Sequence, residues 1–219
     1  MDDILFKKWN EWSDIIYWDV HNTLSITRYV FRKVKDIVEN NPKINKYNIF
    51  YEFLGSVYIR SALMGVRRHV KIKKDSISFA GLLEEIYKNP EILSRERFVN
   101  LYKEIGEDED LASEEFDDRV GKRRSYVDPN QVNSDLKKLK EKAKKCEKYA
   151  DWSVAHIDKR AIKELPPFKE SEFQDLDSCI YFLGKLVKKY YFLIRALDLP
   201  ILRKPLYDWK AIFREQWLP

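Results

Sequence analysis

Two long stretches in the second half of the chain carry matched apolar stripes, and they constrain the fold more than any other feature of the sequence. Residues 132–157 and 176–197 both place apolar side chains at steps of three and four. This spacing predicts amphipathic helices. Leu165, Pro166 and Pro167 separate the stripes, because proline ends a helix. We therefore expect two long helices, about 132–164 and 170–197, packed as an antiparallel hairpin.

The first half of the chain shows the same periodicity. Apolar residues from Leu5 to Ile37 predict one long helix, bent near His21–Asn22 and ending before Pro42. A second helix is expected over about 46–69, where small residues would let a neighbouring helix approach closely.

Short elements fill the remainder of the sequence. A helix over SFAGLLEEIYK is expected to be capped by Asp75–Ser76 or by Ser78, and another should follow over 91–104. Residues 104–126 are interpreted as a mobile acidic connector or a weak helix, and 206–217 as a last short helix. The prediction is a single all-α domain over residues 1–219, a helical bundle with long antiparallel helices and short accessory helices.

Composition favours a cytoplasmic protein. The first residues, MDDILFKKWNEW, lack the apolar core of a signal peptide, and no stretch approaches the roughly 20 apolar residues that span a bilayer. Cys146 and Cys179 share no CxxC spacing and fall on apolar helical faces, so we expect buried free thiols.

No cofactor or metal is predicted. The sequence holds no HExxH, no Gly-rich phosphate loop and no GxSxG, and three scattered histidines make a zinc site improbable. His21, inside the first helix, is interpreted as structural. His69 follows Arg67–Arg68 at the expected end of the second helix, where cations complement the helix dipole.

Charge is segregated along the chain. Net charge is +5, residues 104–118 hold nine carboxylates, and residues 137–148 hold seven lysines. A lysine face of this kind serves solubility, or it draws in a polyanion by counterion release. RNA or DNA is therefore a candidate partner.

The most informative segment is YADWSVAHIDKR, residues 149–160. Trp152, His156 and Arg160 are spaced by four and should share one helical face, which Lys148 extends by a turn. An imidazole at the border of core and basic surface suits acid–base work, and an arginine can hold a phosphate in a bidentate pair. The alternative is a border histidine bonded to a partner helix.

This segment resembles the A-H-x-D core that ends the long third helix of HEPN-type domains. It is most similar to the abortive-infection U-type (AbiU-like) branch of bacterial and phage-defence loci. Residues 59–86, IRSALMGVRRHVKIKKDSISFAGLLEEI, resemble that branch's second helix and the start of the next, through Arg67–Arg68, Asp75 and SISFAGLL.

The resemblance implies an all-α bundle, often dimeric, whose active members are metal-independent ribonucleases. In those members an arginine precedes the motif histidine by four to six intervening residues, and two copies meet across the dimer interface. His156 matches the histidine. The arginine positions hold Asp151, Ala150 and Tyr149 instead, and an aspartate would repel the scissile phosphate.

Three hypotheses follow. The first is a non-catalytic HEPN-like module of a bacterial defence or toxin–antitoxin-like system that binds RNA or a neighbour-encoded protein. The second is a metal-independent endoribonuclease with His156 as general base. The third is a structural homodimer. The candidate residues are catalytic His156 and Arg160, and, for nucleic-acid binding, Lys144, Lys145, Lys148 and Trp152.

Overall fold

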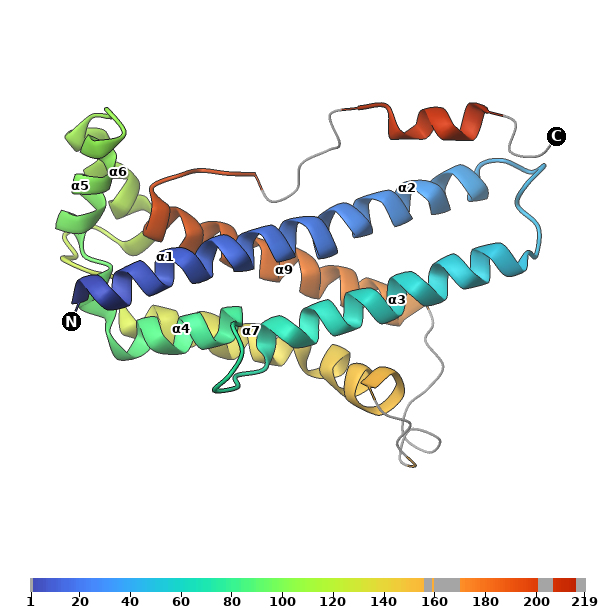
Figure 1. Ribbon diagram of the computed structural model, residues 1–219, viewed down its shortest axis with the longest axis horizontal. Coiled ribbons are helices and arrows are strands. Elements are labelled where there is room, and N and C mark those ends of the chain that lie inside the picture. Colours follow the sequence, from blue (N-terminus) through green and yellow to red (C-terminus); the bar gives the residue numbers. More distant parts are fainter. Residues whose placement is uncertain (1, 156–158, 160–169, 201–206, 216–219) are drawn as a thin grey trace.

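The structure is a computed structural model that describes residues 2–155, 159, 170–200 and 207–215. Within these ranges every named secondary-structure element is a helix (Figure 1). The long elements are α1 (Asp2–Asp19), η1 (Val20–Ile26), α2 (Thr27–Glu39), α3 (Ile49–Val70), α7 (Pro129–Tyr149), η3 (Ala150–Ala155) and α9 (Glu170–Arg195). The short ones are α4 (Phe79–Lys88), η2 (Pro90–Ile92), α5 (Arg95–Glu104), α6 (Glu109–Val120) and η4 (Trp209–Arg214). This confirms the all-α bundle.

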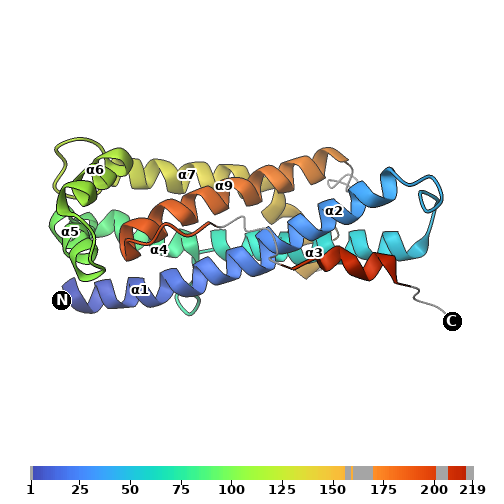
Figure 2. The ribbon, with the colours of Figure 1, turned by 90° about the horizontal axis from the view of Figure 1, so that it is seen from above.

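The helices form four parallel or antiparallel rods around one core. The first rod is α1–η1–α2, the second is α3 followed by α4, the third is α7–η3, and the fourth is α9 (Figures 1 and 2). Helix α7 packs on α3, α4 and α9, and it lies beside α9 as the matched stripes predict. Their buried faces include Leu139, Ala143, Leu183 and Val187.

The first rod is continuous but contains a π-helix, η1, at the place where a bend was expected. A π-turn takes one more residue than an α-turn, so it shifts the apolar stripe around the helix. Leu24 is therefore buried, whereas Thr23 and Ile26, which continue the apolar spacing of α1, are only half-buried. Beyond η1, helix α2 has no fully buried residue, although its apolar stripe is half-buried.

The acidic segment is not a mobile connector. Residues 109–120 form α6, which Asp108 caps by accepting from the N–H groups of Asp110 and Leu111. Ala112 and Phe116 are buried at a spacing of four, and Phe116 packs on Phe98 of α5. The carboxylates lie on the outer face. The acidic segment is therefore an amphipathic helix whose apolar positions are hard to recognise in the sequence among so many charged residues. Helices α5 and α6 together close one end of the bundle (Figure 2).

The structure also bears on the predictions for the α4 cap, the cysteines and the last helix. Ser78 caps α4 by accepting from the N–H of Gly81, as one of the two expected alternatives. Both cysteines are buried and free. The described part of the last element is a 3-10 helix, η4, whose Trp209 meets Tyr29 of α2 edge to face. Among the described residues, no helix is long and apolar enough to cross a membrane.

Candidate functional site

The predicted site residues divide into two groups. His156 and Arg160 lie outside the described residues, so their predicted catalytic roles stay predictions. Lys144, Lys145, Lys148 and Trp152 are described, on α7 and on the π-helix η3 that continues it.

Four lysines follow one outer face of α7. Lys137, Lys140, Lys144 and Lys148, which we call the lysine row, are spaced by three, four and four, so they lie one above another over about 17 Å. Lys137, Lys140 and Lys144 are exposed, and within the described part of the chain none of these three forms an ion pair. The opposite face of α7 is buried through Leu136, Leu139 and Ala143. The row is therefore a solvent-facing strip of positive charge.

Lys145 has a different environment from its neighbour Lys144. It is one residue further around the helix, which turns it toward α9. There its Nζ lies 3.0 Å from Glu172 Oε1 and 2.7 Å from Asp175 Oδ2. Hydrogen bonds to Asp175 and Glu172 raise the pKa of the Lys145 ammonium. These contacts give Lys145 a structural part in the α7–α9 pair.

The lysine row leads to an aromatic residue. The Nζ of Lys148 lies 4.3 Å from the centre of the Trp152 ring, a cation–π contact that fixes the indole beside the end of the row. Trp152 is half-buried and belongs to η3. A row of lysines ending on an indole offers both charge for phosphates and a ring on which a base can stack.

Asp151, the residue at the nearest arginine position of the HEPN motif, is held by two cations, Arg67 of α3 and Lys71, which directly follows that helix. Arg67 donates a hydrogen bond to Asp151 Oδ1, and Lys71 donates to Oδ2 at 3.0 Å. Lys71 also lies 3.4 Å from Glu147 of α7. Burial raises the pKa of Asp151, but the bonds from Arg67 and Lys71 outweigh it, so the pKa is lower than usual. The carboxylate is therefore ionised and paired.

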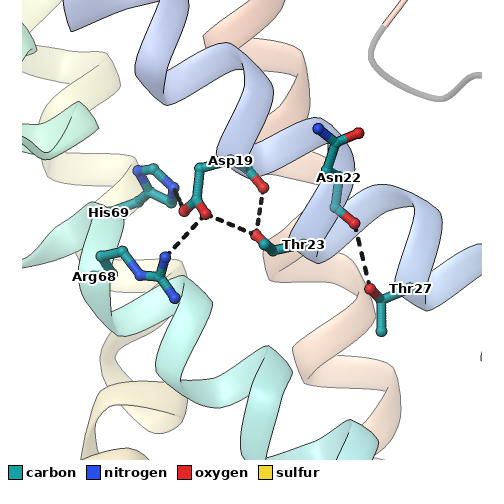
Figure 3. A network of polar contacts seen from close by, with 6 residues as sticks. All are labelled: Asp19, Asn22, Thr23, Thr27, Arg68 and His69. Carbon is teal, nitrogen blue, oxygen red and sulfur yellow. Dashed lines mark hydrogen bonds and ion pairs between the residues drawn. The ribbon is translucent and has the colours of Figure 1, made fainter.

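A second aspartate is bound by the same end of α3 (Figure 3). Asp19 accepts from Arg68 Nη1 at 2.9 Å, from Thr23 Oγ1 at 3.1 Å, and pairs with His69 Nε2 at 2.8 Å. Burial raises the pKa of Asp19, but its bonds to His69, Arg68 and Thr23 bring the pKa below its ordinary value. His69 is buried and contacts Asp19 directly, a partner that the helix-dipole interpretation did not include.

Both aspartates lie where a π-helix begins. Asp19 directly precedes η1, and Asp151 is the second residue of η3. Arg67, Arg68 and His69 at the end of α3 therefore connect the π-helices η1 and η3 through their contacts with Asp19 and Asp151. Segments of this kind occur frequently at functional sites, where the extra residue re-aims side chains. The basic run RRHVK was the available signal, but its partners depend on tertiary packing that the sequence does not display.

His21 fits its predicted structural role. It is buried in η1 and stacks on Tyr17, with ring centres 5.8 Å apart and planes 4° from parallel. Within the described ranges, no group of three or more His, Cys, Asp or Glu side chains could hold a metal ion.

An acid titration tests the pairing of Asp151. Because its folded pKa lies below the ordinary value of 3.8, its pairs contribute stability above that pH and lose it as the pH falls through the folded pKa. We expect Asp151→Asn to cost about 1 kcal/mol near neutral pH, since the site is partly exposed, and that deficit to shrink as the pH falls below the ordinary pKa of 3.8 and through the lower folded pKa. Chemical unfolding at several pH values measures it.

Asp118→Asn is the matched control, because Asp118 is exposed on α6 and has no ion pair among the described residues. It should behave like the wild type at each pH. A deficit in Asp151→Asn that is constant from neutral to acid pH would show that the Asp151 charge contributes nothing.

Comparisons with known proteins found no counterpart: no family model, curated protein or solved structure matched the chain. The likeness to HEPN-type domains therefore stays a prediction from two short motifs, and function is inferred from that prediction together with the geometry of α7, η3 and α3.

Proposed function

We propose that the chain is a non-catalytic HEPN-like module that binds RNA along the lysine row of α7. The observation that carries this proposal is the exposure of Lys137, Lys140 and Lys144 without ion-pair partners among the described residues. When lysines on one face contact phosphates, they displace counterions condensed on the nucleic acid. The release of these counterions favours binding at each contact. Lysines that serve only solubility would more often be interleaved with acidic residues. Beside this row lie Glu141 and Glu147, and Glu147 is paired with Lys71.

The Trp152 ring supports single-stranded RNA as the ligand. Aromatic side chains stack with unpaired bases irrespective of sequence, whereas bases inside a duplex are not available. Lys148 and Trp152 are in contact, so a phosphate and the adjacent base could be engaged together at the end of the row. The defence-system setting, a neighbour-encoded protein partner and a cytoplasmic location come from the sequence interpretation and remain part of the proposal.

A binding role accounts for Asp151 better than a nuclease role does. Asp151 occupies a motif-arginine position, and its charge is used to hold Arg67 and Lys71. The alternative of a metal-independent ribonuclease draws support from the same contacts, because they bring two cations to Asp151, which precedes His156 by five positions in the sequence. RNA cleavage without added metal that is lost in His156→Ala would favour this alternative, and intact RNA across pH would exclude it.

Binding of a labelled single-stranded RNA, followed by fluorescence anisotropy, tests the proposal. From the expected salt dependence, Lys140→Ala and Lys144→Ala should each weaken binding about five-fold near 0.1 M salt. The control is Lys103→Ala with Lys188→Ala, which removes two positive charges whose ammonium groups are already paired with Glu109 and Asp198. If the control weakens binding as much as Lys140→Ala with Lys144→Ala, the lysine row is not the contact surface.

A further inference from the structure

The first half of α3 exposes a continuous apolar face. Ile49 is 77% exposed, Phe53 59% and Val57 49%, and Phe50 is also exposed. The opposite face of the same helix is buried through Tyr58 and Ala62. A contiguous apolar strip of this kind marks an interaction surface more often than it occurs by chance on a monomer.

The exposed face has the spacing of a helix–helix seam. Ile49, Phe53, Ser56 and Arg60 follow one another at four, three and four residues, the alternation of positions that face a partner helix in a coiled coil. Two charges flank it, Glu52 near the start and Arg60 at the end. Both are exposed, and in the described part of the chain neither forms an ion pair. The seam is therefore acidic at one end and basic at the other.

We propose that this face binds the same face of a second copy of the chain, with the two α3 helices antiparallel across a twofold axis. In this register Phe53 of each copy lies level with the small Ser56 of the other, so a large side chain meets a small one twice. Ile49 lies level with Arg60 of the second copy, whose side chain reaches Glu52 one turn away. The seam is thus complementary to itself in both size and charge.

The antiparallel direction follows from the charges. A parallel pair would place Glu52 beside Glu52 and Arg60 beside Arg60, and like charges would repel. The antiparallel pair joins unlike charges and also opposes the two helix dipoles. The interface is separate from the lysine row, because α3 begins at the end of the bundle opposite to the start of α7 (Figure 1).

The mass of the full chain in solution, measured by sedimentation after nuclease treatment, tests the interface. We expect a dimer at micromolar concentration. Phe53→Glu should raise the dimer dissociation constant about 100-fold, as for a central aromatic anchor. Ile4→Glu is the matched control: Ile4 is 78% exposed on α1, outside the seam, and its variant should remain dimeric. RNA affinity per protomer should be unchanged in Phe53→Glu, which separates this proposal from the proposed function.

The direction is tested by charge exchange and cross-linking. Glu52→Arg and Arg60→Glu should each weaken the dimer, and the two together should restore it. Ile49→Cys mixed with Arg60→Cys should form a disulfide, whereas neither should do so alone; Cys146 and Cys179 are buried and should not compete. A cross-link in Ile49→Cys alone would indicate a parallel pair and overturn the proposal.

Three other results would overturn it as well. The first is a wild-type chain that stays monomeric at micromolar concentration, with a lower melting temperature in Phe53→Glu, which would mean that the face is covered within the chain. The second is a dimer that persists in Phe53→Glu. The third is a dimer that dissociates on nuclease treatment, which would assign the association to bound nucleic acid.

Discussion

Replacing Asp177 with alanine is expected to lower the free energy of unfolding by about 3 kcal/mol. Asp177 is a buried residue of α9 that gathers three partners from two other helices. Arg32 lies 2.6 Å from Oδ2, the Nε of Arg28 lies 3.2 Å from Oδ1, and the hydroxyl of Tyr58 donates to Oδ1 at 3.2 Å. Its removal would take this shared acceptor away from Arg28, from Arg32 and from the buried hydroxyl of Tyr58.

The effect should be large because α2 has little else to hold it. Helix α2 has no fully buried residue, so its attachment depends on half-buried apolar contacts and on these ion pairs. We place the cost at the low end of the range for a broken buried pair, since both arginines keep some contact with solvent. Burial, and then the neighbouring Asp177 charge, raise the pKa of Tyr58, which keeps its hydroxyl protonated as a donor.

Thermal unfolding measures this prediction, with a decrease of about 6–12 °C expected for a chain of this length. Asp36→Ala is the control, because among the described residues Asp36 forms an ion pair with Lys33 of its own helix alone, at an exposed site. Its cost should stay below about 0.5 kcal/mol. Equal stability of the two variants would show that the Asp177 pairs do not attach α2 to α9.

Gly65→Ala is expected to destabilise the fold by about 1–3 kcal/mol, whereas Gly55→Ala in the same helix should stabilise it by about 0.5–1 kcal/mol. A Cβ on Gly65 would lie 2.5 Å from Leu24 Cδ2 and 3.3 Å from its Cγ. Leu24 is buried in η1 and has little room to move. A Cβ on Gly55 would have no atom within 4 Å, so only the gain in helix propensity remains.

Urea unfolding of both variants gives the comparison. Opposite changes in the free energy of unfolding for the two variants would show that α3 approaches the π-helix η1 most closely at Gly65. A Gly65→Ala variant as stable as Gly55→Ala would mean that Leu24 repacks without cost and that the approach does not depend on glycine.

The rods could be predicted from the sequence because each depends on a local repeat. Apolar steps of three and four located α7 and α9, and Pro166–Pro167 separated them. Which residues of the first rod face the core could not be predicted beyond Val20. A π-turn adds one residue to the helix, and no residue type in the sequence marks where it does so. Helix α6 was expected only as one of two alternatives, a weak helix or a mobile connector, because its many carboxylates made the apolar positions Ala112 and Phe116 hard to recognise.

The candidate site was predictable to a similar extent. Helical periodicity alone places Lys144 and Lys148 on one face, and the structure keeps them there. Helical periodicity does not reveal that Lys145 turns toward carboxylates of α9, because that contact depends on how two helices far apart in the sequence pack together. The pairing of Asp151 with Arg67 joins residues 84 positions apart, for which a single sequence provides no signal.

The central claim is that the lysine row binds RNA through its phosphates, and the salt dependence of binding tests it most directly. With four lysines each neutralising a phosphate of a single strand, the logarithm of the association constant should fall with the logarithm of salt concentration at a slope of about −3. In the variant Lys137→Ala, Lys140→Ala, Lys144→Ala, the slope should become about −0.7. An unchanged slope in this variant, or no binding by the wild type at low salt, would contradict the claim.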